Sequence, residues 1–304
     1  MRVLLIVNSS ASSVTARTRV VIQKALAADH EVTVAETSRR GHATRLAQGA
    51  ARDGVNVVVV LGGDGTLNEA ANGLAGSATA LAPLPGGSTN VFSRTLGLPD
   101  DPTEATGALL DALGRSSIRR VGLGSVNGRF FLFHVGIGFD AAVVQQVERR
   151  SSLKRYASHA LFVYAALETA VRHYDRSRPR LSVHYEDGTV IDDGYTAICS
   201  KTSPYTYLGT RPIPIAPDAG FDQPLVMVTL RTLAFHTVVG LLGSAFLGRE
   251  RAKHHPKVDY RANVHEVTVR GHGPVPYQLD GDYLGDAHVL VLRYEPAVLD
   301  LVVP

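Results

Sequence analysis

The chain has 304 residues, of which 45% are hydrophobic and 19% are charged, a balance typical of a folded protein and long enough for two domains. Its one cysteine, Cys199, excludes an internal disulfide and a metal site built from thiolates, and fits a reducing compartment. The net charge of +3 is small and no basic stripe stands out, so we expect no nucleic-acid partner. No run reaches about 18 apolar residues, so we expect no membrane-spanning helix and a cytoplasmic protein.

The first third of the sequence alternates between predicted strands and predicted helices. Strands are expected at residues 3–7, 31–36, 57–61 and 80–83, and helices at residues 17–28, 42–53 and 67–74. Continuous apolar strands that alternate with helices predict a parallel sheet covered on both faces. We therefore assign residues 1–120 to an α/β domain.

Strands dominate the rest of the chain. Asn127-Gly128 separates predicted strands at residues 118–126 and 129–135, a pattern typical of a hairpin. Further strands are expected at residues 180–185, 190–200, 225–230, 264–270 and 289–294, and helices at residues 141–148, 159–174 and 233–247. This pattern predicts a mainly antiparallel, β-rich second domain over residues 121–295.

The predicted strand at residues 57–61 leads directly into Gly62-Gly63-Asp64-Gly65-Thr66. Glycines let a backbone approach a phosphate closely, and the first amide groups of a helix favour anions. Asp64 would repel a phosphate unless a cation lay between them, which favours Mg²⁺ at this residue. A tight turn with Asp or Thr as a helix cap explains the same five residues, so this segment alone leaves both interpretations open.

A second glycine-rich segment, LPGGSTNVFSR at residues 84–94, follows the next predicted strand. It also ends in hydroxyl and amide side chains at a predicted helix start. Two such loops at the carboxyl ends of strands in one sheet can face a single crevice, so the pair favours phosphate binding. The pattern is not a P-loop, because no Gly-Lys-Ser/Thr follows, and it is not the dinucleotide turn of a first strand.

The segments GGDGTLNEAANGL and LPGGSTNVFSR resemble the diacylglycerol kinase catalytic family, which includes bacterial lipid kinases and sphingosine kinases and is related to NAD kinases. The resemblance covers nearly the whole chain, because further segments follow in the family's order: TSRRGHA (37–43), VGIGFDAAVV (135–144), IAPDAGFD (215–222) and QLDGDYLG (278–285). It implies an α/β nucleotide domain and a β-sandwich-like domain with ATP in the cleft, and residues 296–304 returning to the first domain.

The resemblance implies an ATP-dependent lipid kinase that phosphorylates a lipid hydroxyl, with diacylglycerol as the leading acceptor. A sphingoid base or a glycerophospholipid is the alternative acceptor, and a catalytically inactive nucleotide-binding regulator is the alternative from another class. ATP and Mg²⁺ are the implied cofactors, with Asp64 acting on the metal. The positions implied to contact ATP are Asn8, Thr37, Gly62, Gly63, Asp64, Gly65, Thr66, Leu67, Asn68, Glu69, Gly87, Ser88, Thr89 and Asn90.

Several positions depart from the family. After the first strand the family often has Asn-Pro-x-Ser-Gly, where this chain has Asn8-Ser9-Ser10-Ala11-Ser12. Ser88 stands where the second loop of the family has Thr, and it keeps the hydroxyl group. Gly122 stands near the position where many members carry an Asp of the metal network. Some members hold a structural metal with an acid of an Asp-Asp-Gly turn, where this chain reads Asp222-Gln223-Pro224, so we do not expect that metal.

Asp280 and Asp282 flank Gly281, and the local sequence is typical of an Asp-Gly hairpin turn. The family has Asp-Gly-Glu here, and the resemblance implies that these acids accept the proton of the lipid hydroxyl. Asp282 stands in place of the Glu and is one methylene shorter. We assign the base to this pair, which the sequence does not separate.

The segment at residues 233–247 is apolar nearly all round. It is typical of a buried core helix, of a wall for acyl chains, or of a surface at the bilayer interface. The basic tract at residues 249–257 fits either a solvated loop or contact with anionic lipid. Peripheral membrane contact therefore stays open, as does the oligomeric state, whereas the histidines lack the spacing of a metal site.

Overall fold

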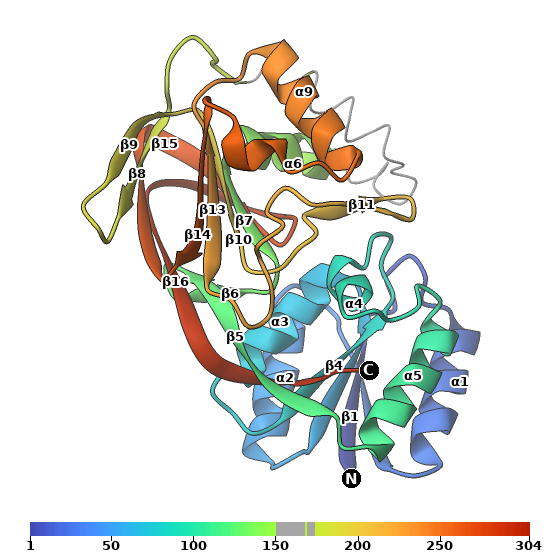
Figure 1. The fold of residues 1–304 in the computed structure, drawn as a ribbon. Coiled ribbons are helices and arrows are strands. Elements are labelled where there is room, and N and C mark those ends of the chain that lie inside the picture. The colour runs from blue at the N-terminus through green and yellow to red at the C-terminus, as the bar shows by residue number, and fades with distance from the viewer. Residues whose placement is uncertain (150–167, 169–173) are drawn as a thin grey trace. The chain divides into compact units, whose positions relative to one another are not determined.

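A computed structural model describes residues 1–149, 168 and 174–304 (Figure 1). Nearly all of the helix expected at residues 159–174 lies outside the described residues. The chain divides into two compact units: unit 1 contains Met1–Leu123 with Glu295–Pro304, and unit 2 contains Gly124–Tyr294. As expected, unit 1 is an α/β unit with a parallel sheet and unit 2 is mostly antiparallel β structure.

The sheet of unit 1 contains a row of short parallel strands: β1 (Arg2–Val7), β2 (Glu31–Glu36), β3 (Val57–Gly62) and β4 (Ala80–Pro85). Their order is β4-β3-β1-β2, and the end of the long strand β16 (Asp282–Val302) adds to β4 by a parallel pairing of Leu301 with Leu81. The strands β1, β3 and β4 are almost entirely apolar and buried because both faces of the sheet are covered there, whereas the edge strand β2 is partly exposed.

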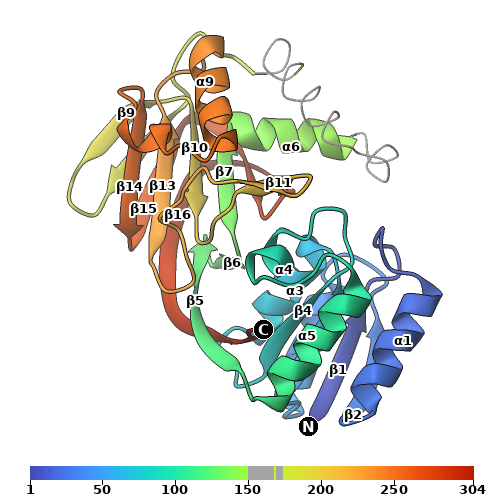
Figure 2. The same cartoon turned by 45° about the vertical axis from the view of Figure 1, so that its right-hand side comes forward.

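Two pairs of helices cover that sheet (Figures 1 and 2). On one side, α1 (Ala16–Ala27) and α5 (Pro102–Gly114) pack with side chains such as Leu5 and Val59 in one buried cluster. On the other, α2 (His42–Arg52) packs against α3 (Asp64–Leu74). A short helix, α4 (Val91–Thr95), follows β4.

Unit 2 is built on antiparallel strands in the order β14-β13-β10-β7-β15-β16. Two smaller hairpins accompany them, β8–β9 on β15 and β11–β12 by itself. The bounds of these strands are β7 (His134–Gly138), β8 (Leu181–Tyr185), β9 (Val190–Gly194), β10 (Thr196–Ser200), β11 (Thr206–Leu208), β12 (Arg211–Ile213), β13 (Leu225–Leu230), β14 (Val258–Val264) and β15 (Glu266–Leu279). The helical elements described are α6 (Phe139–Arg149), α9 (Phe235–Phe246) and the 3₁₀ helix η2 (Arg251–His254).

The hairpin expected at Asn127-Gly128 is confirmed: β5 (Ile118–Val126) pairs with β6 (Arg129–Phe131), and both turn residues have positive φ. The single strand expected at residues 129–135 is wrong, because β6 ends at Phe131 and β7 pairs instead with β10 and β15. The strand expected at residues 190–200 is likewise two strands, which meet different neighbours on either side of Tyr195. An apolar run in the sequence does not show where one strand ends and the next begins to pair with a different neighbouring strand.

Two further boundaries differ from expectation. Helix α3 begins at Asp64, three residues before the predicted start, so Gly65 and Thr66 belong to its first turn. The interpretation of residues 233–247 as a core helix is wrong, because α9 exposes several of its large apolar side chains. Within the described ranges, no helix is both long enough and apolar enough to cross a membrane.

Candidate functional site

The two glycine loops of unit 1 pack backbone against backbone at the carboxyl ends of β3 and β4. The Gly86 amide donates to the Gly62 carbonyl oxygen at 2.9 Å. A Cβ atom at Gly86 would lie 2.8 Å from the Gly62 nitrogen, and one at Gly87 would lie 2.9 Å from the Gly63 Cα. The glycines of the second loop are therefore required for the two loops to approach each other.

Asp64 is the first residue of α3, and its carboxylate joins that helix to the second loop. Its Oδ2 accepts the Val91 amide at 3.0 Å and its Oδ1 accepts the Phe92 amide at 3.1 Å, which caps the start of α4. A carboxylate oxygen has more than one acceptor direction, so these contacts are compatible with Mg²⁺ held through water. Among the described residues no three His, Cys, Asp or Glu side chains gather as a metal cage, and the metal role of Asp64 stays a prediction.

The start of α3 has no side-chain cap. Gly63 is its N-cap residue, with an extended backbone and no capping hydrogen bond. The first amide groups of a helix have no partner inside the helix, so those of Gly65 and Thr66 face the loop region with the positive end of the helix dipole. This is the kind of helix start that binds phosphate groups.

The segment after β1 contacts both loops. Asn8 Nδ2 donates to Thr66 Oγ1 at 2.8 Å, and the Ser13 amide donates to the Gly86 carbonyl at 2.9 Å. Thr37 follows β2 at the same edge of the sheet, where its amide donates to the Val7 carbonyl at 2.9 Å. The structure thus brings the predicted residues Asn8, Thr37 and Thr66 to one edge.

Three further predicted positions, Leu67, Asn68 and Glu69, follow Thr66 in α3. Leu67 and Asn68 are buried. The Glu69 carboxylate accepts the Gly41 amide at 2.7 Å and the Ala43 amide at 3.2 Å, and so caps the start of α2. These contacts explain the three residues without a ligand, and their predicted contact with ATP stays a prediction.

In the second loop, Asn90 is buried and holds the turn. Its Oδ1 accepts the Gly87 amide at 2.7 Å and its Nδ2 donates to Asp100 Oδ1 at 2.8 Å. Ser88 is exposed and Thr89 is half-buried, and neither hydroxyl group has a hydrogen-bond partner within the part of the chain that the structure describes. The loop therefore presents two hydroxyl groups on a framework fixed by Asn90.

In unit 2, Asp280 and Gly281 form a two-residue turn between β15 and β16, and both have positive φ. The buried carboxylate of Asp280 accepts the Leu132 amide at 2.7 Å and the Phe133 and His134 amides at 3.0 Å each. Asp280 therefore anchors the turn to residues 132–134, where the chain passes from β6 into β7.

Asp282 is the first residue of β16, where it pairs with Leu279 and is half-buried. The next residue, Tyr283, donates its amide to Glu148 Oε1 of α6 at 3.0 Å. The two acids that the sequence left equivalent thus have different surroundings, and neither proton-accepting role is tested by the fold alone.

A buried polar cluster beneath this turn was missed by the sequence reasoning. Tyr205 Oη donates to Asp140 Oδ1, and Gln278 Nε2 donates to Asp140 Oδ2 at 2.9 Å. Gln278 Oε1 in turn accepts the Gly281 amide at 2.8 Å, which links the cluster to the turn. Asp140 and Gln278 lie in the segments VGIGFDAAVV and QLDGDYLG that carried the resemblance, whereas nothing in the sequence marks Tyr205.

Burial changes the acid–base behaviour of this cluster. It raises the pKa of Asp140 above its usual value, which two hydrogen bonds to the carboxylate oppose, and it raises the pKa of Tyr205. His134 stacks on Tyr205 with ring centroids 4.2 Å apart, and burial lowers the pKa of this imidazole to about 3. His134 is therefore neutral near pH 7.

At the turn where we expected no structural metal, the Lys201 ammonium lies among backbone carbonyls. Its fully buried Nζ donates to Gly220 at 2.7 Å, Gln223 at 3.0 Å and Phe221 at 3.1 Å. A side-chain cation thus already neutralises the carbonyl oxygens of this turn, and the donor set does not favour an additional metal ion.

Comparison with known proteins identifies the class to which this architecture belongs. Residues 2–126 match the model of the diacylglycerol kinase catalytic domain, and residues 134–303 match the YegS C-terminal NAD kinase beta sandwich-like domain. The chain therefore belongs to the family of diacylglycerol kinases and YegS-like lipid kinases.

Individual relatives agree with this assignment. A diacylglycerol kinase of Staphylococcus saprophyticus is 26% identical over 272 residues, which are 87% of this chain and 83% of the relative. A diacylglycerol kinase of Bacillus subtilis is 36% identical over 121 residues, only 39% of each chain. A protein named probable lipid kinase YegS-like from Chromohalobacter salexigens is 38% identical over 120 residues, 38% of this chain and 37% of the relative.

Solved structures show the same fold. A diacylglycerol kinase structure from Bacillus anthracis str. Sterne aligns with a TM-score of 0.70 at 21% identity, covering 100% of this chain and 97% of the other. An NAD kinase from Archaeoglobus fulgidus in complex with ATP aligns with a TM-score of 0.56 at 11% identity, covering 99% and 93% of the two chains.

Proposed function

We propose that the protein is an ATP-dependent lipid kinase that transfers the γ-phosphoryl group to a lipid hydroxyl, with diacylglycerol as the acceptor and phosphatidic acid as the product. The observation that carries the proposal is the pair of backbone-packed glycine loops beside the uncapped start of α3, with the Ser88 and Thr89 hydroxyl groups unpartnered in the described structure. The names of the relatives support the acceptor.

In this proposal the loops of unit 1 bind the phosphates of ATP. The amide groups at the start of α3 and the hydroxyl groups of the second loop donate to phosphate oxygens, and the glycines keep side chains away from them. Bound Mg²⁺ would neutralise charge on the phosphates, and Asp64 is the residue of this chain that would hold it through water.

Asp282 is the proposed proton acceptor. The three amides on the Asp280 carboxylate engage that group in the fold, which favours Asp282 for the chemistry. Asp282 takes the proton of the lipid hydroxyl while the oxygen of that hydroxyl forms a bond to the γ-phosphorus of ATP. The bond from that phosphorus to the bridging oxygen breaks, and ADP leaves with the electron pair.

The test is labelled-phosphate transfer from ATP in mixed micelles that contain, one at a time, diacylglycerol, monoacylglycerol, ceramide, sphingosine or phosphatidylglycerol. We expect ATP turnover only with a lipid alcohol present, and the highest rate with diacylglycerol. If the rate were highest with sphingosine or phosphatidylglycerol, the proposed acceptor would be wrong, but the proposed reaction, phosphoryl transfer to a lipid hydroxyl, would stand. ATP binding without any lipid-dependent turnover would overturn the proposal in favour of a nucleotide-binding regulator.

A further inference from the structure

The side chain of Lys201 is fully buried in unit 2 although it ends in an amine. Its Nζ donates to the carbonyl oxygens of Gly220 at 2.7 Å, Gln223 at 3.0 Å and Phe221 at 3.1 Å. All three oxygens belong to one turn, residues 220–223, in which the Gln223 amide donates to the Gly220 carbonyl at 3.2 Å. We call these three oxygens the carbonyl cage.

Lys201 connects the ends of two neighbouring strands. It directly follows β10, and the carbonyl cage lies just before β13, with which β10 pairs from Thr196 to Ser200. The main chain at Lys201 is held separately, because its amide donates to the Phe133 carbonyl at 2.8 Å. The side chain can therefore be changed without removing the backbone contact that fixes this position.

The carbonyl cage favours the charged form of the amine. An ammonium group has three N–H donors, so each oxygen of the cage can accept one of them. A neutral amine has two donors and a lone pair, and the lone pair would then face a carbonyl oxygen. The ring of Tyr294, whose centre lies 5.3 Å from Nζ, also favours a cation. Burial would be costly for an unpaired charge, so the cage and the ammonium group stabilise each other.

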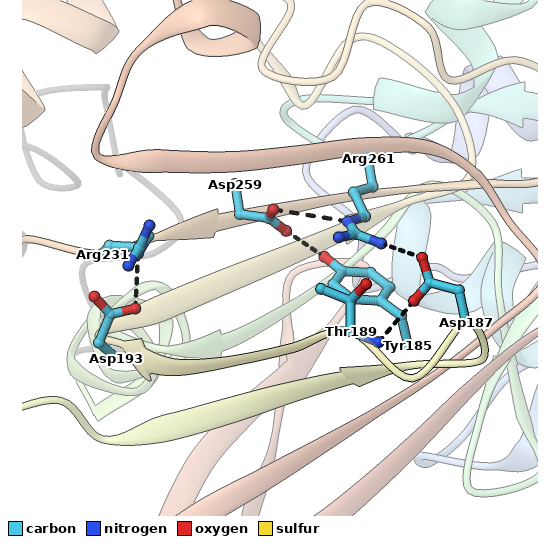
Figure 3. A network of polar contacts seen from close by, with 7 residues as sticks. All are labelled: Tyr185, Asp187, Thr189, Asp193, Arg231, Asp259 and Arg261. Atoms are coloured by element: carbon cyan, nitrogen blue, oxygen red, sulfur yellow. Dashed lines mark hydrogen bonds and ion pairs between the residues drawn. The ribbon is translucent and has the colours of Figure 1, made fainter.

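Two arginines of unit 2 show the more usual way of placing a cation (Figure 3). Arg261 pairs with the Asp187 carboxylate at 2.9 Å, and Arg231 pairs with the Asp193 carboxylate at 2.7 Å. Both arginine side chains are partly exposed to solvent. Several backbone carbonyls of one turn are instead a set of ligands that proteins offer to hard metal cations such as Ca²⁺. The contacts of Lys201 with the carbonyl cage therefore have the form of a metal site.

A metal ion at this turn does not fit the residues of this chain. The Lys201 ammonium group already uses the carbonyl oxygens that would be its ligands. Among the described residues, no three His, Cys, Asp or Glu side chains gather as a metal cage. The resemblance implies an acid-bound structural metal at this turn in some members of the family, whereas this chain has Gln223 within the turn.

We propose that Lys201 is a built-in cation that takes the place of a bound metal ion in unit 2, so that the turn at residues 220–223 is ordered without a metal. It follows that a shortened side chain would leave the carbonyl cage as a site for a small free cation. The ammonium ion fits this site because the cage already accepts N–H donors at 2.7–3.1 Å, and K⁺ fits because carbonyl oxygens can replace its hydration shell. The inference does not depend on the proposed kinase reaction.

The experiment is thermal unfolding of the full chain without ATP, at equal ionic strength in ammonium, potassium or tetramethylammonium chloride. Tetramethylammonium is the reference cation, because it has no N–H donor and is too large for the site. The Tm of the wild type should be the same in the three salts and should not change when EDTA removes metal ions. These two results would show that the ammonium group of Lys201 already fills the cage.

Two variants of Lys201 separate the charge from the space that it occupies. Lys201→Met fills the space with an uncharged chain, so its Tm should be about 5–10 °C lower than that of the wild type in every salt. Lys201→Ser opens the space and should lose a similar amount in tetramethylammonium chloride. In ammonium or potassium chloride it should regain about half of that loss or more, because a cation that binds only the folded chain stabilises it.

The matched controls use an exposed lysine of the same unit. Lys257→Met and Lys257→Ser make the same two changes at a side chain that lies on the surface. Both control variants should unfold within about 2 °C of the wild type, because surface substitutions change stability little. Neither should respond to the identity of the cation, which separates a filled cage from a general effect of the salts.

Three results would overturn the proposal: a wild-type Tm that falls in EDTA, a wild-type Tm for Lys201→Met, or a Lys201→Ser variant that behaves alike in all three salts. The last result counts whether that variant is folded or unfolded, because in both cases the cage has not accepted a free cation. Circular dichroism distinguishes the two states, and folding that returns with ammonium would support the proposal. Phosphoryl transfer to lipid tests the proposed function separately, since none of these melting temperatures depends on it.

Discussion

Asp280 and Asp282 lie two residues apart but have different surroundings, and this difference gives a prediction. Asp282→Asn should lower kcat by about 100-fold or more, because the acceptor hydroxyl loses its base, with thermal stability unchanged. Asp280→Asn should lower the free energy of unfolding by about 1–3 kcal/mol, because its side chain then offers one acceptor oxygen for three buried amides. Thermal unfolding and steady-state kinetics in micelles measure both effects. Wild-type kcat for Asp282→Asn would place the base elsewhere.

His134 gives a prediction about stability and pH. Burial lowers its pKa from the ordinary 6.5 of an imidazole to about 3 in the folded protein. Between these values the unfolded chain binds a proton that the folded chain does not, so unfolding takes up a proton and stability decreases as the pH falls from about 6.5 toward 3. Each pH unit in this window costs up to about 1.4 kcal/mol.

Replacing His134 by Phe should remove this contribution while an aromatic ring still stacks on Tyr205. The free energy of unfolding should then depend less steeply on pH between about 4 and 6. Urea unfolding of both proteins across that range measures the slope. The contribution of Asp140 to the pH dependence of stability has the opposite sign. Because burial raises its pKa, the free energy of unfolding decreases as the pH rises above 3.8. The variant Asp140→Asn is therefore the matched comparison. Parallel slopes for wild type and His134→Phe would contradict the buried neutral imidazole.

Helices and strands could be predicted best where a local pattern, such as apolar periodicity or an Asn-Gly turn, decides the structure. The alternation of apolar strands and helices predicted β1, β2, β3 and β4 within a few residues, and Asn127-Gly128 predicted the hairpin. Prediction was least accurate where long-range pairing decides, as in the division of residues 129–135 into β6 and β7. Apolar runs also marked only parts of β15 and β16, whose remaining residues are held in strands by pairing with each other.

The candidate site shows the same division between local and long-range information. The glycine loops and the Asp-Gly turn could be found from the sequence because each is a short segment. The role of Glu69 as a cap of α2 and the contact of Tyr205 with Asp140 join residues far apart in the chain. The exposure of α9 stayed one of several interpretations for a related reason, since an apolar composition does not reveal which side of a helix meets the core.

The packing of the two glycine loops predicts unequal effects of alanine substitution. Gly87→Ala places a Cβ atom 2.9 Å from the Gly63 Cα, so the loops must separate, whereas Gly63→Ala places one 3.5 Å from the Gly87 Cα, an ordinary contact. Gly87→Ala should lower the free energy of unfolding by about 1–3 kcal/mol and weaken ATP binding. Gly63→Ala should leave stability near that of the wild type. Thermal unfolding and calorimetry with ATP measure both, and equal stability of the two variants would contradict the tight packing.

At the scale of the whole molecule, unit 1 depends on a strand from the end of the described chain. Leu301 of β16 is fully buried and pairs with Leu81 of β4. Leu301→Ala should lower the free energy of unfolding by about 2–5 kcal/mol. The half-buried Val303 is the control, and Val303→Ala should cost less than about half of that. Hydrogen exchange should show the loss of protection in β4, and uniform protection in the Leu301 variant would contradict the role of this strand.

The same strand has a consequence for the order in which the protein is completed during translation. Unit 2 is one continuous segment, Gly124–Tyr294, whereas unit 1 contains residues from both sides of it. The ribosome therefore makes all of unit 2 before it makes the strand that covers the open edge of β4. Until then the nascent unit 1 displays an unpaired strand edge, which is a site for aggregation. Unit 1 is thus completed only after unit 2. We expect a chaperone to bind at the exposed edge of β4, and we expect a ribosome that stalls before residue 295 to leave that edge unpaired.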